Sequence, residues 1–97
     1  MSYKEQDLRR FLPVQKRRAR QLGLNFVKDI VVSPLKNKKY RVYLTDGNHV
    51  DYGYYPMEDY LQHRDPERRR RFQARWRNHP GINNPYSAVF YITRLNW

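Results

Sequence analysis

Apolar residues near the start of the chain recur at helical intervals, namely Leu8, Phe11 and Leu12. Ser2 and Glu5 have the spacing of a capping box, so a first helix is predicted over about residues 3–12. A second helical segment is expected to run from Pro13 to Leu22, because proline is tolerated in the first turn of a helix. Gly23 suits the position that follows the end of such a helix.

The middle of the chain has the pattern of β-strands. Residues 26–32 are rich in Val, Ile and Phe and predict a strand. Residues 40–44 and 49–54 flank Asp46-Gly47, and an Asp-Gly pair between alternating segments is a strong hairpin signal. One face of the first hairpin arm is expected to carry the side chains of Tyr40, Val42 and Leu44.

Two helices are predicted after the hairpin. Pro56 can begin a short helix that ends near His63. Asp65-Pro66 then has the character of an N-cap and a first helical residue, and predicts a helix that extends to about Asn78. Phe72 and Trp76 are four residues apart, so they are expected to form the buried stripe of this helix.

The last segment, residues 86–97, is ambiguous. Asn84-Pro85 again has N-cap character and favours a helix, whereas the β-branched residues Val89, Ile92 and Thr93 also suit a strand. We favour the helix. The predicted fold is therefore α+β, with a β-hairpin or three-stranded antiparallel meander packed by short helices.

Size and composition are consistent with one small domain. A chain of 97 residues normally builds a single core, and 39% hydrophobic and 15% aromatic residues supply its apolar surface. We expect residues 23–97 to form a compact domain and residues 1–22 to form a basic helical arm outside it. Pro13 divides the arm into two helices that are short enough to be unstable alone in water.

Charge narrows the choice of partner. The chain has 20 basic and 9 acidic residues and a net charge of +11, which favours association with polyanions or acidic protein surfaces. Seven arginines lie between Arg64 and Arg77, and a second basic cluster spans Lys16 to Arg20. Guanidinium groups at helical spacing can follow a row of phosphates or an acidic protein groove. The expected contact residues are Lys16, Arg17, Arg18, Arg20, Arg64, Arg70, Arg71, Arg75 and Arg77.

Other chemistries have weaker support in the sequence. The hairpin tyrosines could stack on bases, but a domain of this size first needs such rings in its core. The chain has no cysteine, and its three histidines fall in different predicted elements, so a metal site is not expected. No nucleophile triad, phosphate-binding glycine loop or carboxylate pair is found, which predicts a protein that is not an enzyme and has no cofactor or small-molecule substrate. No apolar run has the length of a membrane span.

From about residue 36 to residue 97 the chain resembles a family of small uncharacterised proteins of large nucleocytoplasmic DNA viruses and some tailed phages. The residues that carry the resemblance are Lys38-Lys39-Tyr40, Asp46-Gly47, Tyr52-Gly53, Asp59-Tyr60, His63, Asp65, Glu67-Arg68-Arg69, Arg75, Asn84-Pro85, Ala88 and Leu95 to Trp97. Trp76 departs from the pattern, and residues 1–35 have no counterpart in it. The resemblance implies a viral context and no mechanism.

Two functions follow as expectations. The first is a minor capsid or other virion-associated structural protein, which attaches to capsid proteins through its basic arm and arginine-rich helix. It would be found in the virion, and in the host cytoplasm or nucleus during assembly. The alternative is a viral nucleic-acid-binding protein that contacts phosphates with little sequence selectivity.

Overall fold

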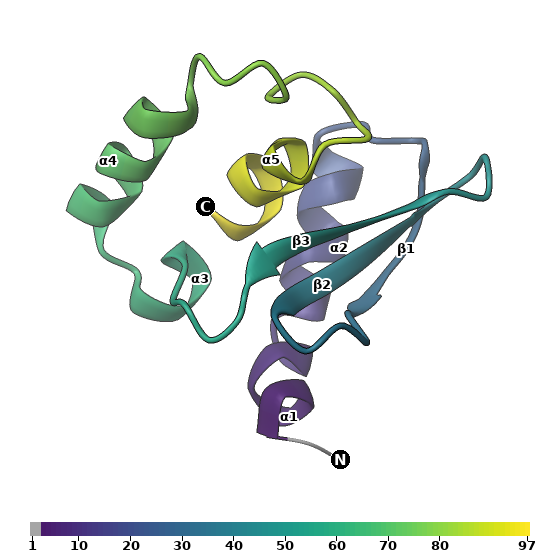
Figure 1. Cartoon of the computed structure of the whole chain (residues 1–97), viewed down its shortest axis with the longest axis horizontal. Coiled ribbons are helices and arrows are strands. Elements are labelled where there is room, and N and C mark those ends of the chain that lie inside the picture. Colours follow the sequence, from purple (N-terminus) through teal and green to yellow (C-terminus); the bar gives the residue numbers. More distant parts are fainter. Residues whose placement is uncertain (1–2) are drawn as a thin grey trace.

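The computed structural model describes residues 3–97, which form a three-stranded sheet and several helices. Figure 1 shows how the helices are arranged beside the sheet. The order along the chain is α1 (Tyr3–Arg9), α2 (Leu12–Gln21), β1 (Val27–Val32), β2 (Lys38–Leu44), β3 (His49–Tyr54), α3 (Tyr60–His63), α4 (Pro66–Trp76), α5 (Ala88–Tyr91) and the π-helix η1 (Ile92–Asn96). The predicted α+β fold is confirmed. The expected capping role of Ser2 lies outside the described residues. No helix in residues 3–97 is long and apolar enough to cross a membrane.

The sheet is an antiparallel meander in the order β1-β2-β3. Val42 lies opposite Ile30 on one side and Val50 on the other, so β2 is the central strand. The predicted hairpin is confirmed, and Gly47 has the positive φ of +92° that its turn requires. Alternation holds from Tyr40 to Leu44 in β2, because Tyr40, Val42 and Leu44 are buried while Tyr43 is exposed.

The N-terminal helices are part of the core. Leu8 of α1 and Ala19 of α2 belong to the same buried cluster as Ile30 and Tyr40, and Gln15 is completely buried. The Tyr40 hydroxyl donates to the backbone oxygen of Leu8 at 2.9 Å. The expectation that residues 1–22 form an arm outside the core is therefore corrected for α1 and α2, because Leu8, Gln15 and Ala19 of these helices are buried.

The C-terminal segment is helical, as favoured from the sequence. It completes the core with Phe90, Tyr91 and Leu95. The predicted start is corrected, because Ser87 rather than Asn84 is the N-cap and accepts from the Val89 N–H at 3.3 Å.

The two helices after the hairpin differ in how well their starts were predicted. Asp65 is the N-cap of α4, as expected, and accepts from the Glu67 N–H at 3.0 Å. The start of α3 is corrected from Pro56 to Tyr60, because Asp59 caps this helix and forms a capping box with Gln62. Helix α4 ends at Trp76 and has no buried residue.

Candidate anion-binding site

Helix α4 lies to one side of the molecule, and the C-terminal end of the chain lies between it and β3 (Figure 1). The Phe72 ring of α4 stacks on the Trp97 ring, with centroids 4.1 Å apart and planes inclined by 6°. Trp76 packs beside Phe72 at 6.0 Å between ring centroids. Phe72 and Trp76 do face inward as predicted, but both stay only partly buried, because they line an open pocket.

This pocket has a volume of about 430 Å³, within the range of sites for small ligands. From α4 it is lined by Arg68, Arg71 and Arg75, which are separated by three and four residues and so share one face of the helix. The aromatic rings of Tyr54, Phe72, Trp76 and Trp97 also line it, with Met57, Ile92 and the carboxylate of Glu58. We call Arg68, Arg71 and Arg75 the pocket arginines.

A buried ion pair forms part of the pocket wall. The ammonium group of Lys39 donates to Asp59 Oδ2 at 2.9 Å and to Gln62 Oε1 at 2.8 Å. Burial lowers the pKa of Lys39, and the adjacent Asp59 carboxylate opposes that effect. Since Asp59 Oδ1 also accepts from the Leu61 N–H at 3.0 Å, the pair connects β2 to the start of α3.

Gly53 provides the space for this arrangement. A Cβ at Gly53 would lie 3.0 Å from Asn96 Nδ2 and 3.1 Å from Lys39 Cβ, and the residue has φ of +81°. Both the close approach and the positive φ favour glycine. The glycine therefore allows the Lys39 side chain and η1 to meet at the end of β3.

A second group of arginines comprises Arg18 of α2, Arg64 after α3 and Arg69 of α4. Arg18 donates to the backbone oxygen of Leu95 at 2.9 Å, and Arg69 donates to that of Trp97 at 2.9 Å. Burial lowers the pKa of Arg18, and the charges of Arg69 and Arg64 lower it further. We call Arg18, Arg64 and Arg69 the junction arginines. Their mutual repulsion would be relieved by an anion.

Residues 28–76 match the family of unknown function DUF5754. The chain belongs to this family. The matched region extends from β1 to the end of α4, so it contains Lys39, Asp59 and the pocket arginines. It does not contain α1, α2 or the C-terminal residues that complete the core. No curated protein and no solved structure matches the chain.

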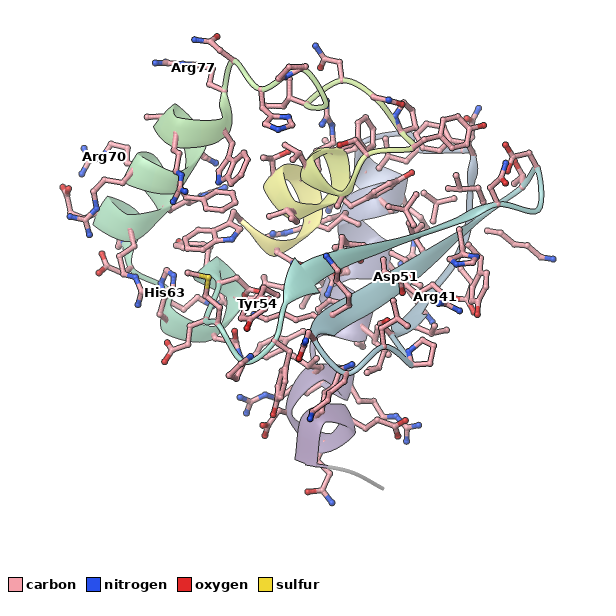
Figure 2. The ribbon with its side chains drawn as sticks, viewed as in Figure 1. Arg41, Asp51, Tyr54, His63, Arg70 and Arg77 are labelled. Carbon is pink, nitrogen blue, oxygen red and sulfur yellow. The ribbon has the colours of Figure 1, made fainter. Side chains whose placement is uncertain are left out.

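The expected contact residues of α4, together with Arg77 at its C-cap, fall into two groups. Arg71 and Arg75 line the pocket, whereas Arg70 and Arg77 point away from the body of the molecule (Figure 2). Arg70 pairs with Glu67 at the surface. Arg64 is exposed at the end of α3 and donates to the Leu61 backbone oxygen at 3.3 Å.

The expected contact residues of α2 lie outside the DUF5754 region and are also divided. Arg17 and Arg20 are exposed. Lys16 instead pairs with Asp29 of β1 at 3.2 Å, and Arg18 is directed to the C-terminal helix. Only Arg18 of this cluster is therefore close enough to Arg64 and Arg69 for their charges to act on it.

Three of the site's cationic residues were not assigned to a contact role from the sequence. Arg68 and Arg69 precede Phe72 by four and three residues, so they flank the Phe72 and Trp76 stripe, and both are half-buried. Lys39 was missed because nothing local separates it from Lys38. The alternative of base stacking on the hairpin is wrong for Tyr40 and Tyr52, which are buried in the core.

The histidines have structural contacts. His63 Nδ1 accepts from the N–H of Asp65, the N-cap of α4, at 3.0 Å. His79 Nδ1 accepts from the Gly81 N–H at 2.9 Å. Residues 3–97 contain no group of three or more His, Cys, Asp or Glu side chains that could hold a metal ion.

Proposed function

We propose that this protein is a non-enzymatic nucleic-acid-binding module that contacts phosphates with little sequence selectivity. The observation that carries the proposal is the crowding of arginines around α4 with few carboxylates near them. Among the α4 arginines in the described chain, only Arg70 has an ion pair within 4.0 Å. The pocket arginines thus present charge along α4, and the junction arginines add charge from α2, from α4 and from the residue that follows α3.

The geometry of these groups suits phosphates. An arginine binds a phosphate through two parallel N–H donors, and side chains spaced along a helix can contact successive phosphates. Arg70 and Arg77 extend from α4 into solvent, where they can reach a backbone without disturbing the fold (Figure 2). Attachment to acidic capsid proteins, the other function expected from the sequence, would use the same charges and stays a prediction.

The test measures binding of a short DNA duplex of mixed sequence by fluorescence anisotropy over a range of salt concentrations. The double variant Arg70→Gln/Arg77→Gln removes two exposed charges, one from α4 and one from its C-cap. The matched control, Lys28→Gln/Lys36→Gln, removes two exposed charges from β1 and the turn after it, and neither residue lines the pocket beside α4.

We expect the α4 variant to melt at the temperature of the parent but to bind more weakly. The slope of log affinity against log salt concentration should decrease in magnitude by about one for each phosphate contact removed. The control should lose less affinity. A parent protein that binds acidic polypeptides but neither duplex nor single-stranded DNA would contradict the proposal and favour a protein partner.

A further inference from the structure

We propose that the pocket between α4 and η1 accepts an unpaired nucleobase, so that the chain binds single-stranded nucleic acid in preference to duplex. This inference rests on the proposed function and identifies the form of nucleic acid that the site selects. It follows from the lining of the pocket rather than from the outward arginines.

The first argument is the aromatic lining. Tyr54 is 58% exposed and lines the pocket from the end of β3, and Trp76 lines it from α4. Phe72 is already stacked on Trp97, which fixes the wall between them. Every base has a flat π-face, so an accessible aromatic ring can stack on a base of any sequence. A base inside a duplex is already stacked and cannot enter such a pocket.

The second argument is the charge at the pocket rim. The pocket arginines line the pocket together with Trp76, and the Arg75 guanidinium lies 5.3 Å from the centroid of the Trp76 ring. The Lys39 and Asp59 charges in the wall are paired with each other, and Glu58 adds one carboxylate. The pocket is therefore apolar in its walls and cationic along α4, which complements a base attached to a phosphate.

The third argument is an unpaired hydrogen-bond donor. Within residues 3–97, Trp76 Nε1 is buried and has no hydrogen-bond partner. Indole N–H groups usually have a partner when buried. A small rotation of the ring towards a bound base would allow this N–H to donate to a base oxygen or nitrogen. Binding would then supply a hydrogen bond that the unbound protein lacks.

The chain offers a direct probe of this pocket. Its two tryptophans are Trp76 and Trp97, and both line the pocket, so all tryptophan fluorescence reports on it. Addition of a thymidine oligonucleotide should quench this fluorescence, because a base would stack on or beside the indole rings. A duplex of the same length should bind through the outer arginines without comparable quenching.

Three variants separate stacking from general binding. Trp76→Leu removes the aromatic face but keeps an apolar side chain, and should weaken oligonucleotide binding by about 5- to 150-fold. Trp76→Phe keeps the ring and should retain most of the affinity. The matched control, Tyr43→Leu, removes an exposed ring from β2 that does not line the pocket, and should bind as the parent does. Circular dichroism melting establishes that each variant folds.

The outcomes distinguish the two proposals. Preference for the single strand, quenching and loss of that preference in Trp76→Leu would support the inference. Equal binding of single strand and duplex, without quenching in the parent protein, would overturn the inference and leave the proposed function standing. Absence of binding to either nucleic acid would overturn both. Because quenching is measured on the parent protein, the test remains decisive even if Trp76→Leu fails to fold.

Discussion

Lys39 Nζ lies 2.9 Å from Asp59 Oδ2, and the two side chains are only 2% and 6% exposed. Gln62 Oε1 occupies a further donor position of the ammonium group at 2.8 Å. A buried pair of this kind does not by itself prove a gain in stability, because removing two charges from water offsets their attraction. Removal of only one of the two side chains does destabilise the protein, since the other charge is then buried without a partner.

The variant Lys39→Met is therefore expected to lower the free energy of unfolding by about 3–5 kcal/mol, because it leaves Asp59 uncompensated. Urea denaturation measures the loss. Lys36→Met is the matched control, since Lys36 is exposed in the turn between β1 and β2. Equal denaturation midpoints for the two variants would show that Asp59 does not depend on Lys39.

Substitution of Gly53 should cost more than substitution of the other glycines with positive φ. An alanine in the left-handed region costs about 1–2 kcal/mol from the backbone alone. Gly23→Ala and Gly47→Ala should show only this cost, because nothing lies within 4 Å of either added Cβ. Gly53→Ala must also displace Asn96 and Lys39. Among the three variants, Gly53→Ala should have the lowest melting temperature. Similar decreases in melting temperature at the three sites would contradict the close packing at Gly53.

Stability should fall as the pH falls below about 6.5, because His63 is harder to protonate in the folded state. Burial lowers the pKa of His63, and Arg68 lowers it further, while Asp65, Asp59 and Glu58 oppose the shift. Above the pKa that His63 has in the unfolded chain, the imidazole is neutral in both the folded and the unfolded protein. Below it the unfolded chain binds a proton that the folded chain does not, until the folded pKa is reached.

His63→Asn tests this assignment, because it keeps a side-chain acceptor near the position of Nδ1 but does not titrate. Urea midpoints at about pH 7.5 and about pH 5.5 should differ less in the variant than in the parent protein. If the parent shows no loss of stability between these values, His63 has the same proton affinity in the folded and unfolded chain.

The sheet could be predicted from the sequence because its signals are local. Tyr40, Val42 and Leu44 alternate with polar residues, and Asp46-Gly47 supplies the backbone conformation of the turn. The cap of α4 was predicted for the same reason, since Asp65 is adjacent to the N–H groups that it accepts from. Each of these features depends on residues that are close neighbours in the chain.

The pocket could not be predicted because it depends on distant contacts. The partners of Lys39 follow it by 20 and 23 residues, and Arg69 donates to a backbone oxygen 28 residues away. Phe72 and Trp76 were expected to be buried by their spacing, but α4 stands away from the body, so the same spacing instead supplies the wall of an open pocket. Periodicity indicates which face turns inward and not how closely that face is covered.

The last prediction concerns the N-terminal helices α1 and α2. It is the opposite of the expectation from the sequence, which placed residues 1–22 in a basic arm outside the compact domain. The basic residues of α1 and α2 suggested an outer arm, yet Leu8 and Ala19 lie in the core and the Tyr52 hydroxyl donates to the buried side chain of Gln15. A fragment of residues 23–97 should therefore lack a cooperative melting transition. Leu8→Ala in the full chain should lower the free energy of unfolding by about 2–5 kcal/mol, because it leaves a cavity against the sheet.

Circular dichroism of the fragment and urea denaturation of the variant measure these two effects. Arg17→Gln/Arg20→Gln is the matched control in the full chain, since both side chains are exposed on α2, and it should unfold at the same urea concentration as the parent. A fragment that melts cooperatively would mean that the sheet and the C-terminal helices form a sufficient core. In that case the buried contacts of α1 and α2 would add little stability, and the basic segment could detach to act as an arm.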